Sequence, residues 1–146
     1  SDLLREENWH LQHAQSGAPL LFENEKRSVL SISISHTIEK MAESGIAYAA
    51  VILSREVEKI GVDIVLKADL RIKRIAHRVM RDEEIETGRL AEVWACKEAM
   101  YKAFGPGLDF VKDLKVDFLS KDLISGMGRK WEVIRKGNTV VVLGPV

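Results

Sequence analysis

The chain has 146 residues, of which 46% are hydrophobic and 30% charged, and its 22 basic and 22 acidic residues cancel to a formal net charge of zero. This balance argues against a dedicated nucleic-acid-binding protein, which carries a basic excess. No apolar run approaches the roughly 18–20 residues that span a membrane. Cys96 is the single cysteine, so an internal disulfide is excluded and a reducing, cytoplasmic setting is favoured. We expect one domain over residues 1–146, with 1–59 and 60–146 as pseudo-halves.

The hydrophobic pattern predicts secondary structure in chain order. A short helix is expected within residues 1–15, followed by a turn at 16–19, where glycine and proline occur together. Apolar residues that alternate with serines from residue 30 onward predict a half-buried strand that ends near His36. Residues 39–45 are expected to form a loop or a helical turn. Further strands are predicted at 46–53, 60–66, 114–119, 130–135 and 139–143.

Two amphipathic helices complete the prediction. Residues 70–81 place apolar side chains at the i, i+3, i+4, i+7 spacing of a core-facing stripe. Residues 89–104 form the second helix, which ends at the run Gly105-Pro106-Gly107. Helices packed on an antiparallel sheet give an α+β fold.

Asp63 is an isolated acid inside the apolar strand at 60–66. Burying an unpaired carboxylate is costly, so this side chain is expected to meet a cation or to line a cleft. Two readings stay open for the residue taken alone. It is either a metal ligand or a structural aspartate that binds backbone or pairs with a lysine.

The helix at 89–104 carries Glu98 and Lys102 at i, i+4 along one edge. Such a spacing is typical of a surface ion pair. Lys97, however, falls near the middle of the apolar arc, where its ammonium has to reach water, an anion or an acid. The helix therefore holds one lysine whose place a surface pair does not explain.

Two motifs are informative as a pair. They are Gly61-Val62-Asp63 and the run from Trp94 to Lys102, which reads WACKEAMYK. They resemble the paired motifs of the 4'-phosphopantetheinyl transferase superfamily, and Ile34-Ser35-His36-Thr37 and Gly17-Ala18-Pro19 resemble two smaller motifs of that family. The resemblance implies the family's fold. It also implies a Mg²⁺-dependent enzyme that moves 4'-phosphopantetheine from coenzyme A to a serine of an apo carrier protein and releases 3',5'-ADP.

The resemblance also implies residue roles. Asp63 and Glu98 would be the Mg²⁺ ligands, Glu98 would also be the candidate base, and Lys102 would assist catalysis at the phosphates. The residues that it places against coenzyme A are Ser35, His36, Lys97 and Lys102. The implied partner is an acidic acyl or peptidyl carrier protein, as in fatty acid biosynthesis, with no nucleic acid and no membrane.

Three departures from the family pattern matter. Val65 stands where surfactin-type members have a third acid, although the short holo-acyl-carrier-protein synthases also lack one there. Ala18 replaces a lysine that helps to bind coenzyme A, and the segment before Ser35 is shorter than in two-lobed surfactin-type members. The chain is thus similar to an N-terminally short surfactin-type member. A catalytically weak relative that binds coenzyme A or carrier without turnover, and a plain interaction domain, remain the alternatives.

A basic stripe follows the helix predicted at 70–81. Its members share one helix face and are Arg71, Arg74, Arg78 and Arg81. A solvated face is the ordinary explanation for such a stripe. Docking of an acidic carrier protein is the functional one.

Overall fold

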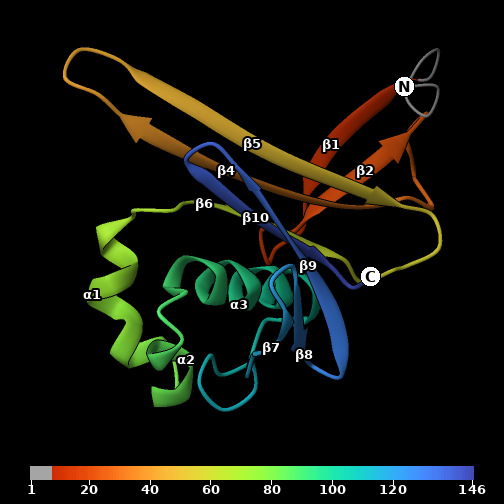
Figure 1. Ribbon diagram of the computed structural model, residues 1–146. Helices are drawn as coiled ribbons and strands as arrows, with labels where there is room; N and C mark the ends of the chain where they lie inside the picture. The colour runs from red at the N-terminus through yellow and green to blue at the C-terminus, as the bar shows by residue number, and fades with distance from the viewer. Residues whose placement is uncertain (1–7) are drawn as a thin grey trace.

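The computed structural model describes residues 8–146 and has an α+β architecture, with three helices against a five-stranded antiparallel sheet and two smaller sheets from the N-terminal part (Figure 1). The helices are α1 (Leu70–Val79), α2 (Asp82–Glu86) and α3 (Leu90–Phe104). The strands are β1 (Trp9–His13), β2 (Pro19–Glu23), β3 (Lys26–Arg27), β4 (Ser31–Lys40), β5 (Gly45–Ser54), β6 (Gly61–Leu66), β7 (Asp117–Ser120), β8 (Leu123–Gly126), β9 (Arg129–Lys136) and β10 (Thr139–Gly144).

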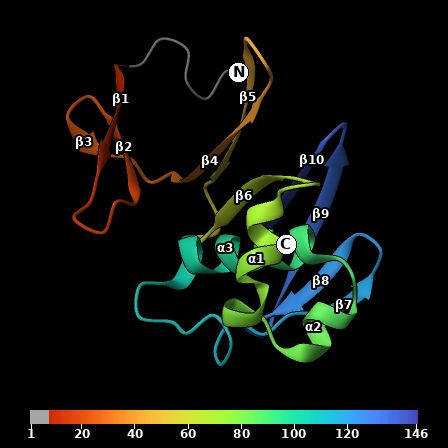
Figure 2. The same cartoon turned by 90° about the vertical axis from the view of Figure 1, so that its left-hand side faces the viewer.

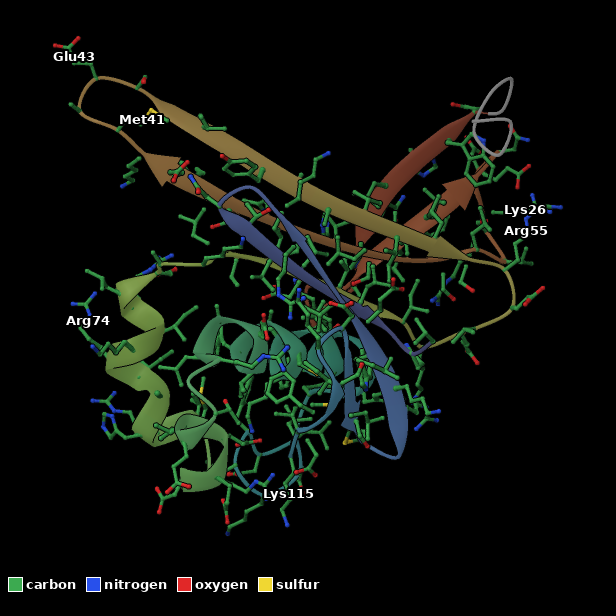
Figure 3. All side chains as sticks on the ribbon, viewed as in Figure 1. Lys26, Met41, Glu43, Arg55, Arg74 and Lys115 are labelled. Carbon is green, nitrogen blue, oxygen red and sulfur yellow. The ribbon has the colours of Figure 1, made fainter. Side chains whose placement is uncertain are left out.

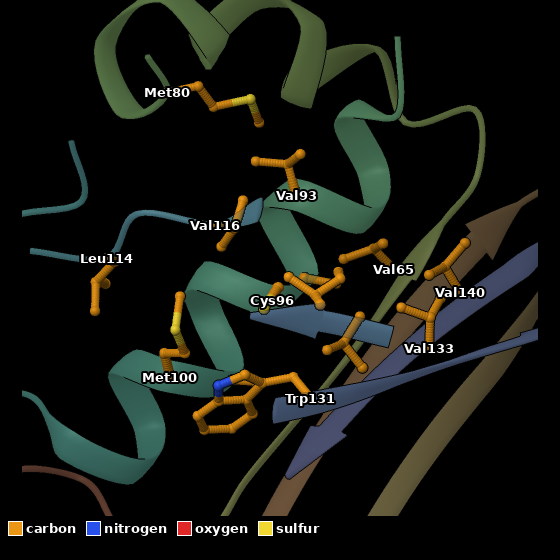
Figure 4. Packing of buried hydrophobic residues seen from close by; sticks show 14 of the residues in the cluster. Val65, Met80, Val93, Cys96, Met100, Leu114, Val116, Trp131, Val133 and Val140 are labelled. Carbon is orange, nitrogen blue, oxygen red and sulfur yellow. The ribbon is translucent and has the colours of Figure 1, made fainter. Parts of the chain in front are cut away.

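The five-stranded sheet has the order β6-β10-β9-β8-β7, so β6 lies at its edge. Helix α3 packs across β6 and β10. The core between α3 and the sheet is closed by fully buried side chains such as Val93, Met100, Leu114 and Trp131 (Figure 4). The predicted strands at 46–53, 60–66, 130–135 and 139–143 and the helix at 89–104 are all confirmed to within a residue or two.

Strand β4 runs along the free edge of β6, and its serines explain how. The hydroxyl of Ser33 accepts a hydrogen bond from the backbone N–H of Val62 at 3.1 Å, and that of Ser35 accepts one from Ile64 at 3.1 Å. An edge strand otherwise leaves such backbone groups unpaired. The alternating serines of β4 therefore take over hydrogen bonds that a further strand would make, and they hold β4 against β6.

The β4–β5 hairpin is longer than the sequence predicted. Strand β4 continues past His36 to Lys40 and pairs with β5 from Gly45, so the loop expected at 39–45 is confirmed over 41–44, while residues 39, 40 and 45 belong to the strands. Side chains near the tip tie the hairpin together and to the sheet. The hydroxyl of Tyr48 donates to Glu39 at 3.2 Å, and the amide of Asn138 donates to the same carboxylate at 3.1 Å.

The N-terminal part forms a three-stranded sheet, β1-β2-β3, that stands to one side of the helices (Figure 2). The short helix expected within 1–15 is wrong over 9–13, which is strand β1, while residues 1–7 lie outside the described residues. Strand β1 pairs antiparallel with β2, a segment that carried no predicted element, across the turn at 14–18. Tertiary pairing thus decides this segment, where the helix signal was weak.

Two boundaries differ for a physical reason. Helix α1 ends at Val79 instead of residue 81, because the carboxylate of Glu84 accepts the backbone N–H of Arg81 at 2.7 Å and begins α2, a helix that was not predicted. The strand expected at 114–119 begins only at Asp117. The N–H of Leu114 still closes a turn onto the carbonyl of Asp109.

Candidate active site

Asp63 lies on β6 with only 7% of its surface exposed, and it is held from two sides. The hydroxyl of Ser35 donates to its Oδ1 at 2.9 Å, and the ammonium of Lys102 donates to the same oxygen at 3.0 Å. Strand β6 approaches α3 so closely that a Cβ on Gly61 would lie 1.8 Å from the carbonyl oxygen of Ala99. Glycine at position 61 therefore allows β6 and α3 to approach closely enough for Asp63 and Lys102 to meet.

Lys102 spans the gap between α3, β4 and β6. Besides the carboxylate of Asp63, its ammonium binds the backbone carbonyl of Val62 at 3.0 Å and that of Ile34 at 3.3 Å. Its side chain remains 29% exposed. The three acceptors fix the position of the Lys102 ammonium, and its partial exposure leaves it accessible to an anionic ligand.

Glu98 is half-buried and lies one helical turn before Lys102 on α3. Burial raises the pKa of its carboxyl, the negative charge of Asp63 raises it further, and the positive charge of Lys102 lowers it. Burial likewise raises the pKa of Asp63, against the opposing effects of Lys102 and Ser35. Glu98 is therefore affected by the negative charge of Asp63, and the single ammonium of Lys102 does not offset the raised pKa of either carboxyl.

Two cavities flank Lys102. One, of about 270 Å³, lies between the turn at 16–19, the β4 segment 32–34 and the side chain of Tyr101. The other, of about 600 Å³, extends from Pro19 toward Arg27 and Lys59. The Gly17-Ala18-Pro19 turn borders the first of these cavities, so the smaller motif and the α3 motif lie on one cleft.

The donor set fits a divalent cation. Mg²⁺ is commonly held by one or two carboxylates together with waters and substrate phosphates, and Asp63 and Glu98 offer two carboxylates whose mutual repulsion a cation would relieve. Within residues 8–146 no group of three or more His, Cys, Asp or Glu side chains is arranged to hold a metal. Val65, which the resemblance to surfactin-type members aligned with a third acid, is buried in the hydrophobic core.

Two residues that the resemblance placed against coenzyme A lie outside the group formed by Asp63, Glu98 and Lys102. His36 sits on the exposed side of the β4–β5 hairpin, on the face of β4 opposite to that of Ser35. Lys97 is fully buried, and its ammonium binds Glu84 at 3.0 Å and the backbone carbonyls of Phe110 and Leu114 at 2.5 and 2.8 Å. Of the three outcomes expected for the ammonium of Lys97, which were water, an anion or an acid, the structure shows the acid, because Glu84 and two backbone carbonyls of the protein itself surround the ammonium.

The predicted arginine stripe is shorter than expected. Arg71 pairs with Asp69, and Arg74 and Arg78 are exposed on α1, where Figure 3 shows Arg74 directed away from the body of the protein. Arg81 lies beyond the end of α1 and turns inward, donating to the carbonyl of Val116 at 3.2 Å. It belongs to the junction with α2 and not to the exposed face.

Sequence reasoning missed one charged residue of consequence, Glu84, which is 2% exposed. It stands in the acidic run Asp82-Glu83-Glu84-Ile85-Glu86, where its neighbours are surface acids at the start of a helix. No periodicity separates it from them. The unexplained lysine at position 97 was the one available signal, because a buried ammonium requires an anionic partner.

Comparison with known families agrees with this geometry. Residues 59–131 match the family model described as 4'-phosphopantetheinyl transferase superfamily. The match covers β6, the three helices and the strands to the middle of β9, and the chain belongs to this superfamily of transferases. No curated protein matched the chain in a direct comparison. Among the described residues no helix is long and apolar enough to cross a membrane.

Proposed function

We propose that this protein transfers the 4'-phosphopantetheine group from coenzyme A to a serine hydroxyl of an apo carrier protein. The observation that carries the proposal is that Lys102 binds Asp63 at 3.0 Å while the charges of both residues act on the half-buried carboxyl of Glu98. Phosphoryl transfer needs positioning and charge neutralisation more than covalent help from the protein. A pair of carboxylates with an adjacent ammonium is suited to that task.

Glu98 and Lys102 have separate roles in the proposed reaction. Glu98 accepts the proton of the incoming serine hydroxyl, and its raised pKa makes it a stronger base than an ordinary surface carboxylate. The serine oxygen forms a bond to the phosphorus of the phosphopantetheine group while the bond from that phosphorus to the bridging oxygen of the pyrophosphate breaks. The electrons and negative charge leave with 3',5'-ADP, and Lys102 neutralises part of the phosphate charge.

Bound Mg²⁺ would supply further charge neutralisation at the pyrophosphate, with Asp63 and Glu98 as its protein ligands. Ser35 orients the Asp63 carboxylate through its 2.9 Å hydrogen bond, and the backbone of Ile64 in turn fixes the serine. The role of Ser35 in this proposal is therefore to set the direction of a metal ligand and not only to contact coenzyme A.

The direct test is mass spectrometry of an apo acyl carrier protein incubated with the protein, coenzyme A and Mg²⁺. The proposal expects the carrier to gain the mass of one phosphopantetheine group, on its acceptor serine, and expects none when Mg²⁺ is chelated. A carrier with that serine replaced by alanine is the control. An unmodified carrier over a range of carriers and conditions would contradict the proposal.

A second candidate is a relative that binds coenzyme A or the carrier without turnover. The observation in its favour is that Val65 is buried where other members place a third carboxylate. Coenzyme A with Mg²⁺ would then raise the melting temperature, since a ligand of the native state stabilises by mass action. The mass-spectrometric assay would stay negative under the same conditions.

The carrier protein and the setting complete the proposal. The exposed arginines Arg71, Arg74 and Arg78 on α1 would attract an acidic acyl or peptidyl carrier, as in fatty acid biosynthesis. A cytoplasmic location agrees with a lone buried Cys96, whose thiol pKa is raised by burial.

A further inference from the structure

The side of α3 that faces away from β6 carries a buried cluster of charged residues that has no role in the proposed transfer reaction. Lys97 and Glu84 pair at 3.0 Å with side chains that are 0% and 1% exposed. Each partner also binds backbone. Glu84 accepts the N–H of Arg81 at 2.7 Å and that of Val116 at 2.8 Å. Lys97 donates to the carbonyls of Phe110 and Leu114.

These bonds join α3 to the segment 105–116 that follows it. Asp109 starts a single turn there, since its side chain accepts the N–H groups of Val111 and Lys112 at 2.9 and 2.7 Å. Such a turn ends with carbonyls that have no partner within it. The ammonium of Lys97 supplies donors to two carbonyls of this segment, so the segment is anchored to the helix by the lysine that precedes Glu98.

The anchored segment reaches the neighbourhood of Glu98 through one aromatic ring. Phe110 stacks on Trp94, with ring centroids 5.6 Å apart, and on Tyr101, at 5.4 Å. Trp94 and Tyr101 lie about one helical turn before and after Glu98. The carbonyl of Phe110 is bound by Lys97 while its ring covers the helix on either side of Glu98. The position of the ring therefore depends on the ion pair.

We propose that Glu84 and Lys97 are positioning residues, which anchor the segment 105–116 so that Phe110 packs beside Glu98 and holds that carboxylate in its reactive orientation. The inference rests on the proposed function for its catalytic part. It assigns the lysine of the motif helix to the protein's own framework, and it makes Glu84, on a different helix, part of the machinery without contact to substrate.

The test compares Lys97→Met with the double variant Glu84→Gln/Lys97→Met. The single variant leaves Glu84 as a buried charge without its ammonium partner, so its melting temperature should fall. The double variant removes that charge and should regain much of the loss. Both variants lack the donors to Phe110 and Leu114, so kcat should stay about tenfold or more below wild type in both, with the KM for coenzyme A unchanged.

Fluorine NMR with 5-fluorotryptophan adds a readout that needs no turnover. Trp94 reports the Phe110 contact, while Trp131, fully buried in the core with its indole N–H bound to the carbonyl of Gly126 at 3.0 Å, reports the fold. Replacing each tryptophan in turn assigns the signals. The Trp94 resonance should move in the double variant while that of Trp131 stays in place.

Each other outcome overturns the inference. A double variant that regains both stability and kcat would make the pair merely structural. A raised KM for coenzyme A with an unchanged Trp94 resonance would assign Lys97 to the phosphates instead. Absence of turnover in the wild type would contradict the proposed function. The Trp94 resonance alone would then test whether Lys97 anchors the segment 105–116, and an unchanged resonance in the double variant would refute the anchoring.

Discussion

The two sides of helix α3 use lysine in opposite ways. On the side facing β6, Lys102 stands between Asp63 and two backbone carbonyls, is partly exposed, and leaves two carboxylates whose pKa values burial has raised. On the other side, Lys97 is fully enclosed with Glu84. The first arrangement remains open to a cation and an anionic substrate, and the second is complete within the protein. One nine-residue motif thus supplies residues of both the proposed site and its framework.

The largest expected effect follows from neutralising the reactive side. Glu98→Gln keeps the shape of the side chain but removes its charge and basicity, so kcat should fall by about 10²–10⁴-fold. Steady-state kinetics on apo carrier protein measure this. Glu86→Gln, on an exposed glutamate of α2, is the matched control. Near-normal turnover in Glu98→Gln would contradict the assignment of Glu98 as base and metal ligand.

The second prediction separates helix position from charge. Gly61→Ala forces a methyl group to within 1.8 Å of the carbonyl of Ala99, so β6 and α3 have to move apart. Overpacking of this kind typically costs about 1–3 kcal/mol of unfolding free energy. Urea denaturation measures it, and Gly45→Ala at the far hairpin, where the nearest atom would be 3.3 Å away, is the control. Equal stability of the two variants would show that the close approach of β6 and α3 does not limit the fold.

A smaller effect is expected at the surface of α1. Arg74→Glu/Arg78→Glu should raise the KM for carrier protein by up to about tenfold at low salt, with less change at high salt, and leave the KM for coenzyme A as it is. Lys26→Glu/Arg55→Glu gives the same change in net charge on the other side of the molecule (Figure 3) and serves as the control. The same carrier KM in both double variants would make α1 a solvated face only.

The smallest effect concerns stability and pH. An acid whose pKa is raised in the native state binds its proton more tightly there, so the free energy of unfolding falls as the pH rises from the ordinary pKa of 3.8 for Asp63 or 4.5 for Glu98 through the raised value. Glu98→Gln removes this penalty for its site. Its melting temperature should exceed that of wild type near neutral pH, and the difference should shrink toward about pH 4.5. A constant difference across pH would contradict the direction of the shift.

Sequence alone predicted most of the longer strands and the helices α1 and α3, because local periodicity reports on them directly, and a specific motif singled out Asp63, Glu98 and Lys102. It did not predict β1 to β3 or β8, since these short strands depend on pairing with partners that the local pattern does not reveal. It also missed Glu84. A partner that lies on another helix and among surface acids becomes visible only when the chain is folded.

The same limit explains why His36 and Arg81 do not lie where the sequence pattern placed them. His36 follows Ser35 directly, but successive side chains of a strand point to opposite faces, so the motif could not hold both against β6. Arg81 continued the arginine spacing of α1, yet the Glu84 carboxylate accepts its backbone N–H and starts a new helix there. In both cases strand geometry or a tertiary hydrogen bond, and not the spacing in the sequence, decides where the side chain lies.

The central claim is that Asp63 and Glu98 hold one cation between them. Its most direct test is a titration of Mn²⁺ into protein with ¹³C-labelled side-chain carboxyl groups and coenzyme A, with the two signals assigned through Asp63→Asn and Glu98→Gln. The account predicts that both signals broaden together at stoichiometric Mn²⁺, that excess Mg²⁺ restores them, and that Asp69 on the loop before α1 stays sharp. Broadening of one signal without the other, or of neither, would contradict a shared site.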